Sequence, residues 1–246
     1  MPSDSALPAP SLDWGLFLDV DGTLVEIAEC PDGVTLDPKL PPALDALSRK
    51  LGGAVALVSG RPISYLDTLF APLRLPMAGL HGLERRCADG CIHPATVMPE
   101  IRAAAEAVRD FARGYPDLLV EDKEATVALH YRQALDLAQP VIAFAEALAR
   151  DLDGVSVQKG KMVVEFRPTG ANKGTAIETF MKKDPFRGRR PVFIGDDVTD
   201  EAGFAVVNRL QGHSIRVGES ERTEATFRIA TVAKLLEWLE NWSASA

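Results

Sequence analysis

The chain has 246 residues, of which 35 are acidic and 27 are basic, and its formal net charge is -8. An acidic chain without a basic stripe is a poor candidate for nucleic-acid binding, and no apolar run approaches the roughly 20 residues that a membrane span needs. The three cysteines, Cys30, Cys87 and Cys91, are odd in number and widely spaced, which indicates a reducing compartment rather than a disulfide framework. We therefore expect a cytoplasmic protein, monomeric by default, with no nucleic-acid or membrane partner.

The first part of the chain alternates apolar strands with amphipathic helices. Residues 15–18 and 54–58 are short apolar runs that end abruptly in polar residues. Between them a helix opens at Asp37-Pro38 and carries leucines on one face, and Pro62 suits the first turn of the next helix. Near-continuous apolar strands that alternate with helices predict a parallel sheet covered on both faces.

The pattern changes after residue 80. Residues 83–92, with an Asp-Gly pair in the middle, are typical of a hairpin, which explains Cys87, Cys91 and His93 more simply than a metal site does. The elements that follow are a helix at 99–113, strands at 118–121 and 126–131, a helix at 136–150, and a second hairpin with strands at 155–157 and 162–166 around Lys159-Gly160. This order predicts a small α+β unit with an antiparallel sheet, inserted at residues 95–167.

The parallel pattern resumes after Pro168. The expected elements are a helix starting near 173, a strand at 191–194, a helix starting near 199, a strand at 213–217 and a terminal helix at 233–242. We therefore expect a core formed by residues 12–94 and 168–246, interrupted by the inserted unit.

Four polar clusters lie where ligands bind in this architecture. Residues 19–23, 59–61 and 195–201 each follow the carboxyl end of a predicted parallel strand, and Asn172-Lys173 begins a helix. In open α/β sheets, ligands bind at that edge of the sheet. The sequence therefore predicts one site, built from segments that are far apart in the chain.

Acidic residues at that edge indicate a cation site. Asp19 and Asp21 can together bind a hard cation, attack phosphorus and transfer a proton, although an acidic turn that ends a strand is the alternative. Asp196 and Asp197 add two more carboxylates, and a divalent cation would relieve their repulsion; an all-oxygen ligand set favours Mg2+ over zinc. The dipole of the following helix explains Asp200 without any ligand.

Ser59 and Lys173 complete the candidate chemistry. Ser59 offers a hydroxyl to an oxyanion beside the backbone N–H groups of a helix start, although a Ser-Gly turn before a helix is more often a cap. Lys173 places a compact cation where carboxylates and a phosphate would need one, and a solvated surface lysine is the alternative.

These clusters resemble the four motifs of the haloacid-dehalogenase-like phosphatases. The motifs are, in order, Asp19–Thr23, Ser59–Arg61, Lys173 and Gly195–Glu201. Within that superfamily, residues 79–85, 129–132 and the stretch from Glu165 to 172–174 resemble the trehalose-6-phosphate phosphatase family. The resemblance covers nearly the whole chain. It implies an α/β fold, a Rossmann-like haloacid-dehalogenase-type parallel-sheet core with an inserted α+β cap that closes over the sugar. It also implies Mg2+ as cofactor and a small phosphorylated sugar as substrate.

The resemblance also implies roles for individual residues. Asp19 would be the nucleophile that forms a phospho-aspartate, and Asp21 the general acid for the leaving sugar and then the base for water. Ser59 and Lys173 would hold the transferring phosphoryl group. The implied metal ligands are Asp19, Asp21 through its backbone carbonyl, Asp196, and Asp197 directly or through water.

In the cap, the resemblance assigns Glu121, Lys123 and Glu165 to the glucose hydroxyls distal to the phosphate. Carboxylates suit polyols because they accept several O–H bonds at once. Without the resemblance, the charged run at 121–124 would be interpreted as a solvated loop. The other residues expected to line the substrate site are Gly60, Arg61, His81 and Asn172.

Three other activities remain open at this point. The first is a related phosphatase that acts on sucrose 6-phosphate or mannosyl-phosphoglycerate, and the second is a sugar phosphomutase that uses the same Asp pair. The third is a sugar-phosphate-binding regulator without turnover, against which the intact Asp19 argues, since a pure binder needs no nucleophile.

Overall fold

The structure is a computed structural model that describes residues 7–27 and 33–245. It divides into two compact units. The first, here called the core unit, comprises Met1–Pro94 and Asn172–Ala246, and the second, the inserted unit, comprises Ala95–Ala171. Each unit has its own hydrophobic core.

The core unit contains an eight-stranded sheet with strand order β12-β11-β10-β1-β2-β3-β4-β5. Its strands are β1 (Trp14–Leu18), β2 (Val55–Val58), β3 (Met77–Gly79), β4 (Glu84–Arg86), β5 (Ile92–His93), β10 (Arg190–Gly195), β11 (His213–Val217) and β12 (Phe227–Ile229). Pairing is parallel from β12 across to β3 and antiparallel from β3 to β5. The predicted parallel α/β sheet and the 83–92 hairpin are therefore confirmed.

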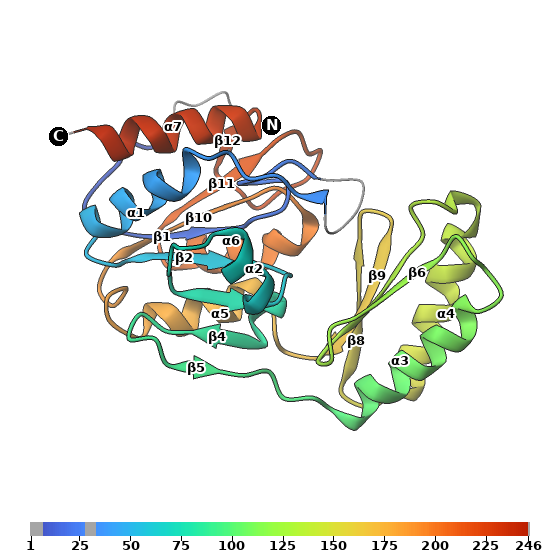
Figure 1. Ribbon diagram of the computed structural model, residues 1–246. Coiled ribbons are helices and arrows are strands. Elements are labelled where there is room, and N and C mark those ends of the chain that lie inside the picture. The colour runs from blue at the N-terminus through green and yellow to red at the C-terminus, as the bar shows by residue number, and fades with distance from the viewer. Residues whose placement is uncertain (1–6, 28–32, 246) are drawn as a thin grey trace. The chain divides into compact units, whose positions relative to one another are not determined.

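Helices cover both faces of this sheet. They are α1 (Leu40–Lys50), α2 (Ile63–Leu69), α5 (Lys173–Met181), α6 (Glu201–Arg209) and α7 (Val232–Ala244). In Figure 1, α1 and α7 lie together above the sheet and α5 lies below it. Because both faces are covered, β1 and β2 are buried along their whole length. Leucines every three or four residues bury the inner face of α1, as predicted.

The inserted unit is a four-stranded antiparallel sheet with order β6-β7-β9-β8. Its elements are α3 (Pro99–Ala112), β6 (Leu119–Asp122), β7 (Val127–His130), α4 (Ala138–Asp151), β8 (Val155–Gly160) and β9 (Val163–Pro168). Figure 1 shows α3 and α4 packed as a pair beside this sheet. The expected hairpin turn at Lys159-Gly160 is wrong by two residues, because Gly160 pairs with Val163 and the turn falls at Lys161-Met162.

Two further findings concern the membrane and disulfide predictions. In the part of the chain that the structure describes, every helix is too short or too polar to cross a membrane. Cys87 and Cys91 are free thiols in the β4–β5 hairpin, and Cys30 lies outside the described residues.

Candidate active site

The loop after β1 is built to bring Asp19 close to the end of β10. The backbone N–H of Asp19 donates to the carbonyl of Ile194 at 2.9 Å, so the two strand ends are in register. Gly22 has a φ of 80°, and a Cβ there would lie 2.1 Å from Oδ2 of Asp196. Only glycine permits both this backbone conformation and this close approach.

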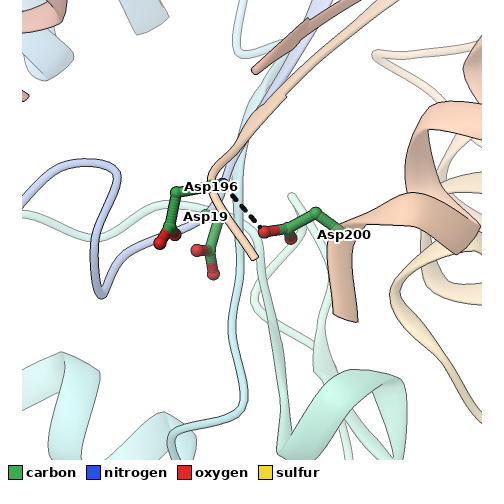
Figure 2. Close-up of side chains that lie close together, drawn as sticks. All are labelled: Asp19, Asp196 and Asp200. Carbon is green, nitrogen blue, oxygen red and sulfur yellow. Dashed lines mark hydrogen bonds between the residues drawn. The ribbon is translucent and has the colours of Figure 1, made fainter. Parts of the chain in front are cut away.

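Three carboxylates meet at this point. Asp19, Asp196 and Asp200 each offer one oxygen, and these oxygens all lie within 4.8 Å of one another. Figure 2 shows the three side chains converging from separate segments of the core unit. The hydroxyl of Thr23 donates to Asp19 at 3.2 Å or to Asp196 at 3.1 Å and so links two of them.

Asp200 holds the loop after β10 in place as well as joining the cluster. Its Oδ2 accepts from the backbone N–H groups of Asp196 at 3.0 Å and Asp197 at 2.9 Å, the first of which is the dashed line in Figure 2. The side chain of Asp200 is completely buried. A Cβ on Gly195 would lie 2.3 Å from Cγ of Asp200, so the strand must end in glycine to admit this carboxylate.

Lys173 is the cation that faces these carboxylates. Its Nζ donates to Oδ1 of Asp19 and to Oδ1 of Asp200, both at 2.6 Å, and its side chain is only 3% exposed. Lys173 is the first residue of α5, and Asn172 caps that helix through a hydrogen bond from the N–H of Thr175 at 2.9 Å. The cap fixes where the helix begins and therefore where the ammonium group points.

The electrostatics of the cluster favour another cation. Burial, reinforced by the neighbouring carboxylates, raises the pKa of Asp19 well above its ordinary value against the opposing effect of Lys173. Burial and the charge of Asp200 raise the pKa of Asp196 to about 6. Burial alone would lower the pKa of Lys173, but the carboxylates of Asp19 and Asp200 outweigh it and raise that pKa above its usual range. One ammonium group therefore does not neutralise three carboxylates.

Asp21 lies outside this carboxylate cluster and pairs with an arginine. Its two carboxylate oxygens accept from Nε of Arg61 at 3.0 Å and from a terminal guanidinium nitrogen at 2.7 Å. The guanidinium carbon of Arg61 also lies 4.5 Å from the centre of the Tyr65 ring. Ser59 is buried, and its hydroxyl accepts from the backbone N–H of Arg61 at 3.1 Å.

His81 lies against the loop that follows β2. A Cβ on Gly60 would lie 2.6 Å from Nε2 of His81, so glycine is needed for this contact. The backbone N–H of His81 donates to the carbonyl of Ser59 at 2.9 Å. Leu80 and His81 both have positive φ values, 49° and 55°. Two consecutive residues in that region are strained, and such strain is concentrated at functional sites.

Within the inserted unit, the three expected sugar-binding residues lie together. Lys123 donates to Glu165 at 3.0 Å, and its Nζ lies 3.7 Å from Oε2 of Glu121. The hydroxyl of Thr126 donates to the same oxygen of Glu165 at 2.9 Å, and Nε2 of His130 lies 3.0 Å from Glu121. Glu165 is buried, and the side chain of Lys123, its partner in the charged run, is only 12% exposed, so the run is not simply a solvated loop.

The structure therefore brings only some of the predicted metal ligands into one cluster. Among the described residues, the cluster of possible metal ligands contains Asp200 in addition to Asp19 and Asp196, but not the side chains of Asp21 or Asp197. The carboxylate of Asp197 instead accepts from the N–H of Val198 and caps a short helical turn. Sequence reasoning missed Asp200 in this cluster, and the signal that could have found it is its position one helical turn after Asp196.

Comparisons with known proteins identify the family. A model of the trehalose-phosphatase family matches residues 17–233. The chain is 52% identical over 216 residues to a probable trehalose-phosphate phosphatase of Sinorhizobium fredii, covering 87% of this chain and 81% of that protein. It is 41% identical over 237 residues to trehalose-6-phosphate phosphatase of Escherichia coli, covering 95% and 88%.

Solved structures agree on the fold. A trehalose-6-phosphate phosphatase related protein superposes with a TM-score of 0.76 at 29% identity, covering 93% of this chain and 96% of that one. A phosphatase of the haloalkanoate enzyme superfamily from Bacteroides thetaiotaomicron superposes with a TM-score of 0.61 at 18% identity, covering 98% and 99%. The expected haloacid-dehalogenase-type fold is confirmed. With the match over 17–233, the chain belongs to the trehalose-phosphatase family, whose members are phosphoric monoester hydrolases.

Proposed function

We propose that the chain hydrolyses trehalose 6-phosphate to trehalose and phosphate, as a cytoplasmic monomer, with Mg2+ and a phospho-aspartate on Asp19. The observation that carries the mechanism is the meeting of Asp19, Asp196 and Asp200 around Lys173 at the carboxyl edge of the sheet. The observation that carries the substrate is the family itself, together with relatives named for this phosphatase activity.

The donor set fits a small hard cation. All three converging ligand atoms are carboxylate oxygens, which Mg2+ prefers over nitrogen or sulfur. Burial, together with the charges of neighbouring carboxylates, raises the pKa values of Asp19 and Asp196, and three carboxylates share one ammonium group here. We assign Asp19 and Asp196 as direct ligands, with Asp200, Asp197 and the backbone carbonyl of Asp21 as further contributors. Bound Mg2+ would supply charge stabilisation for the phosphoryl group.

The proposed reaction has two halves. In the first, a carboxylate oxygen of Asp19 attacks phosphorus, the bond from phosphorus to the sugar oxygen breaks, and Asp21 gives its proton to that oxygen. In the second, water attacks the phospho-aspartate, Asp21 takes the proton of the water, and Asp19 is restored as inorganic phosphate leaves. Lys173 and Ser59 hold the phosphoryl oxygens throughout.

We assign recognition of the sugar to the polar cluster of the inserted unit. Glu121, Lys123 and Glu165 combine two acceptor groups and one donor in a small space, which suits the alternating donors and acceptors of a polyol. From the core unit, we assign Gly60, Arg61, His81 and Asn172 to the substrate site.

The function is tested by measuring phosphate release from a panel of phosphate esters, with Mg2+ and with EDTA. We expect kcat/KM for trehalose 6-phosphate to exceed that for glucose 6-phosphate or sucrose 6-phosphate by about 100-fold, since each lost hydrogen bond to a charged group costs roughly 1.5–3 kcal/mol. EDTA should abolish turnover of all of them.

Equal rates on unrelated esters would contradict the disaccharide assignment, and transfer of phosphate between sugar positions would indicate a mutase. Tight binding of the sugar phosphates without turnover would indicate a regulator.

The same panel tests the sugar-binding cluster. Glu165→Ala and Glu121→Ala are expected to lower kcat/KM for trehalose 6-phosphate by about 10- to 100-fold and to leave a small aryl phosphate almost unaffected. Glu146→Ala, which removes an exposed carboxylate from α4 of the same unit, is the matched control. Parallel losses on both substrates would show that the cluster does not recognise the sugar.

Removing the metal is expected to make stability depend on pH. Because the folded pKa of Asp196 is raised to about 6 from 3.8, the native state binds this proton more tightly than the unfolded state does. Its contribution to stability is therefore complete below the unfolded pKa and is lost as pH rises through the folded pKa. Mg2+ binds the ionised carboxylates, so it should raise Tm by about 5 °C or more near pH 8 and by much less near pH 5.

Thermal unfolding in EDTA and in Mg2+ across that pH range measures this effect. Asp196→Asn should remove most of the magnesium response near pH 8, while Asp45→Asn, a surface carboxylate on α1 paired with Arg49, should keep it. A magnesium shift of the same size at both pH values would contradict the assignment of these carboxylates as ligands.

A further inference from the structure

Arg61 is fixed on several sides before it reaches Asp21. Its backbone N–H donates to the hydroxyl of Ser59 at 3.1 Å, and its carbonyl accepts from the N–H of Leu80 at 3.1 Å. Its guanidinium group stacks at 4.5 Å over Tyr65, and its side chain is only 15% exposed. The guanidinium group is therefore presented to Asp21 in one orientation.

Arg61 forms a bidentate contact with Asp21. Nε of Arg61 donates to Oδ2 at 3.0 Å and a terminal nitrogen donates to Oδ1 at 2.7 Å. Such parallel hydrogen bonds set the plane of the carboxylate as well as its distance. A carboxylate has about four lone-pair sites, so this pairing leaves each oxygen able to accept one more hydrogen bond, in a direction that Arg61 dictates.

We propose that Arg61 is a positioning residue for Asp21 in the water-activating half of the reaction, an inference that rests on the function proposed above. In that half-reaction Asp21 acts as a carboxylate, and Arg61 orients both of its oxygens. Water attacks phosphorus, the bond between phosphorus and the Asp19 oxygen breaks, and the water proton goes to the lone pair that Arg61 leaves open. The gain from a general base depends on this alignment.

The test separates the two half-reactions. Dinitrophenyl phosphate has a leaving group that needs no proton, so phosphorylation of Asp19 stays fast even if Asp21 is misplaced. Arg61→Ala is then expected to give a rapid burst of about one dinitrophenolate per active site, followed by a steady state about 10- to 100-fold slower than that of the native enzyme. The phosphorylated protein should accumulate and be visible by intact-protein mass. Arg61→Lys keeps the positive charge but cannot form the bidentate contact, so its steady-state rate should lie between those of Arg61→Ala and the native enzyme.

Three further variants decide between explanations. Asp21→Asn should also accumulate phosphorylated protein; if it does not, the proposed mechanism itself is wrong. In the Asp21→Asn background, Arg61→Ala should slow the steady state by less than about 3-fold, because the two residues act as one unit. Arg86→Ala breaks a comparable buried pair with Asp67 elsewhere in the core unit, and it should lower Tm without producing a burst. The inference is overturned if Arg61→Ala and Arg61→Lys slow the burst and the steady state equally and accumulate no phosphorylated protein, while Asp21→Asn does accumulate it. Arg61 would then have only a structural role.

Discussion

Asp19→Asn is expected to lower kcat for trehalose 6-phosphate by about 10^4-fold or more, as the loss of other enzymatic nucleophiles does. The amide has no oxygen anion to attack phosphorus, and the change also removes one negative charge from the proposed cation site. The fold should survive, because Asn has almost the same shape as Asp and Lys173 keeps its second partner, Asp200. Phosphate release gives the rate, and thermal unfolding in EDTA gives the stability.

Two controls make this result interpretable. Asp45→Asn removes a carboxylate from the exposed face of α1 and should change kcat by less than about twofold. Intact-protein mass shows whether the introduced amide has reverted to a carboxylate by deamidation, which would restore some activity. Turnover near that of the native enzyme in a sample without deamidation would refute Asp19 as the nucleophile.

Much of the core fold could be predicted because its strands are buried on both faces. Such strands, for example residues 14–18 and 55–58, are continuous apolar runs that stand out from the helices between them. The two strands that the pattern did not predict, β3 and β12, have three residues each. A run that short has no periodicity of its own, and its pairing with β2 or β11 makes it a strand.

Site residues could be predicted from the sequence only where they directly follow the end of a strand. Asp19 and Asp196 follow the ends of β1 and β10, and parallel strands bring such residues to one edge. Asp200 lies farther past the end of β10, at the start of α6, and an acidic residue at a helix start needs no ligand to explain it. What distinguishes it is complete burial beside Lys173, which depends on the packing of α5 against α6.

The pairing of Asp21 with Arg61 illustrates the same limit. The two residues are 40 positions apart. Each belongs to a motif that predicts a different role for its side chain. Their contact depends on the separation and twist of β1 and β2, which neither the composition nor the spacing of residues specifies. The motifs therefore located the residues, while the partners of each side chain had to come from the structure.

Lys173→Ala is expected to have the second large effect, on stability as well as turnover. Removing the ammonium group leaves the carboxylates of Asp19 and Asp200, each 2.6 Å from Nζ in the native protein, without a buried counter-charge. Breaking a buried pair in this way typically costs about 3–5 kcal/mol, which corresponds to a fall in Tm of roughly 6–20 °C for a chain of this size. Turnover should fall by about 10^3-fold, as when a group that stabilises the transferring charge is lost.

The pH dependence of that loss shows whether charge is its cause. With Lys173 gone, protonation of the unpaired carboxylates relieves their repulsion, so the fall in Tm in EDTA should be larger near pH 8 than near pH 5. Lys234→Ala is the matched control, because it removes a surface lysine whose partner Glu237 is three residues away on α7, and such pairs contribute about 0–1 kcal/mol. A fall in Tm for Lys173→Ala that is no larger than that of Lys234→Ala, or that does not change with pH, would mean that the carboxylate cluster is not held together by this lysine.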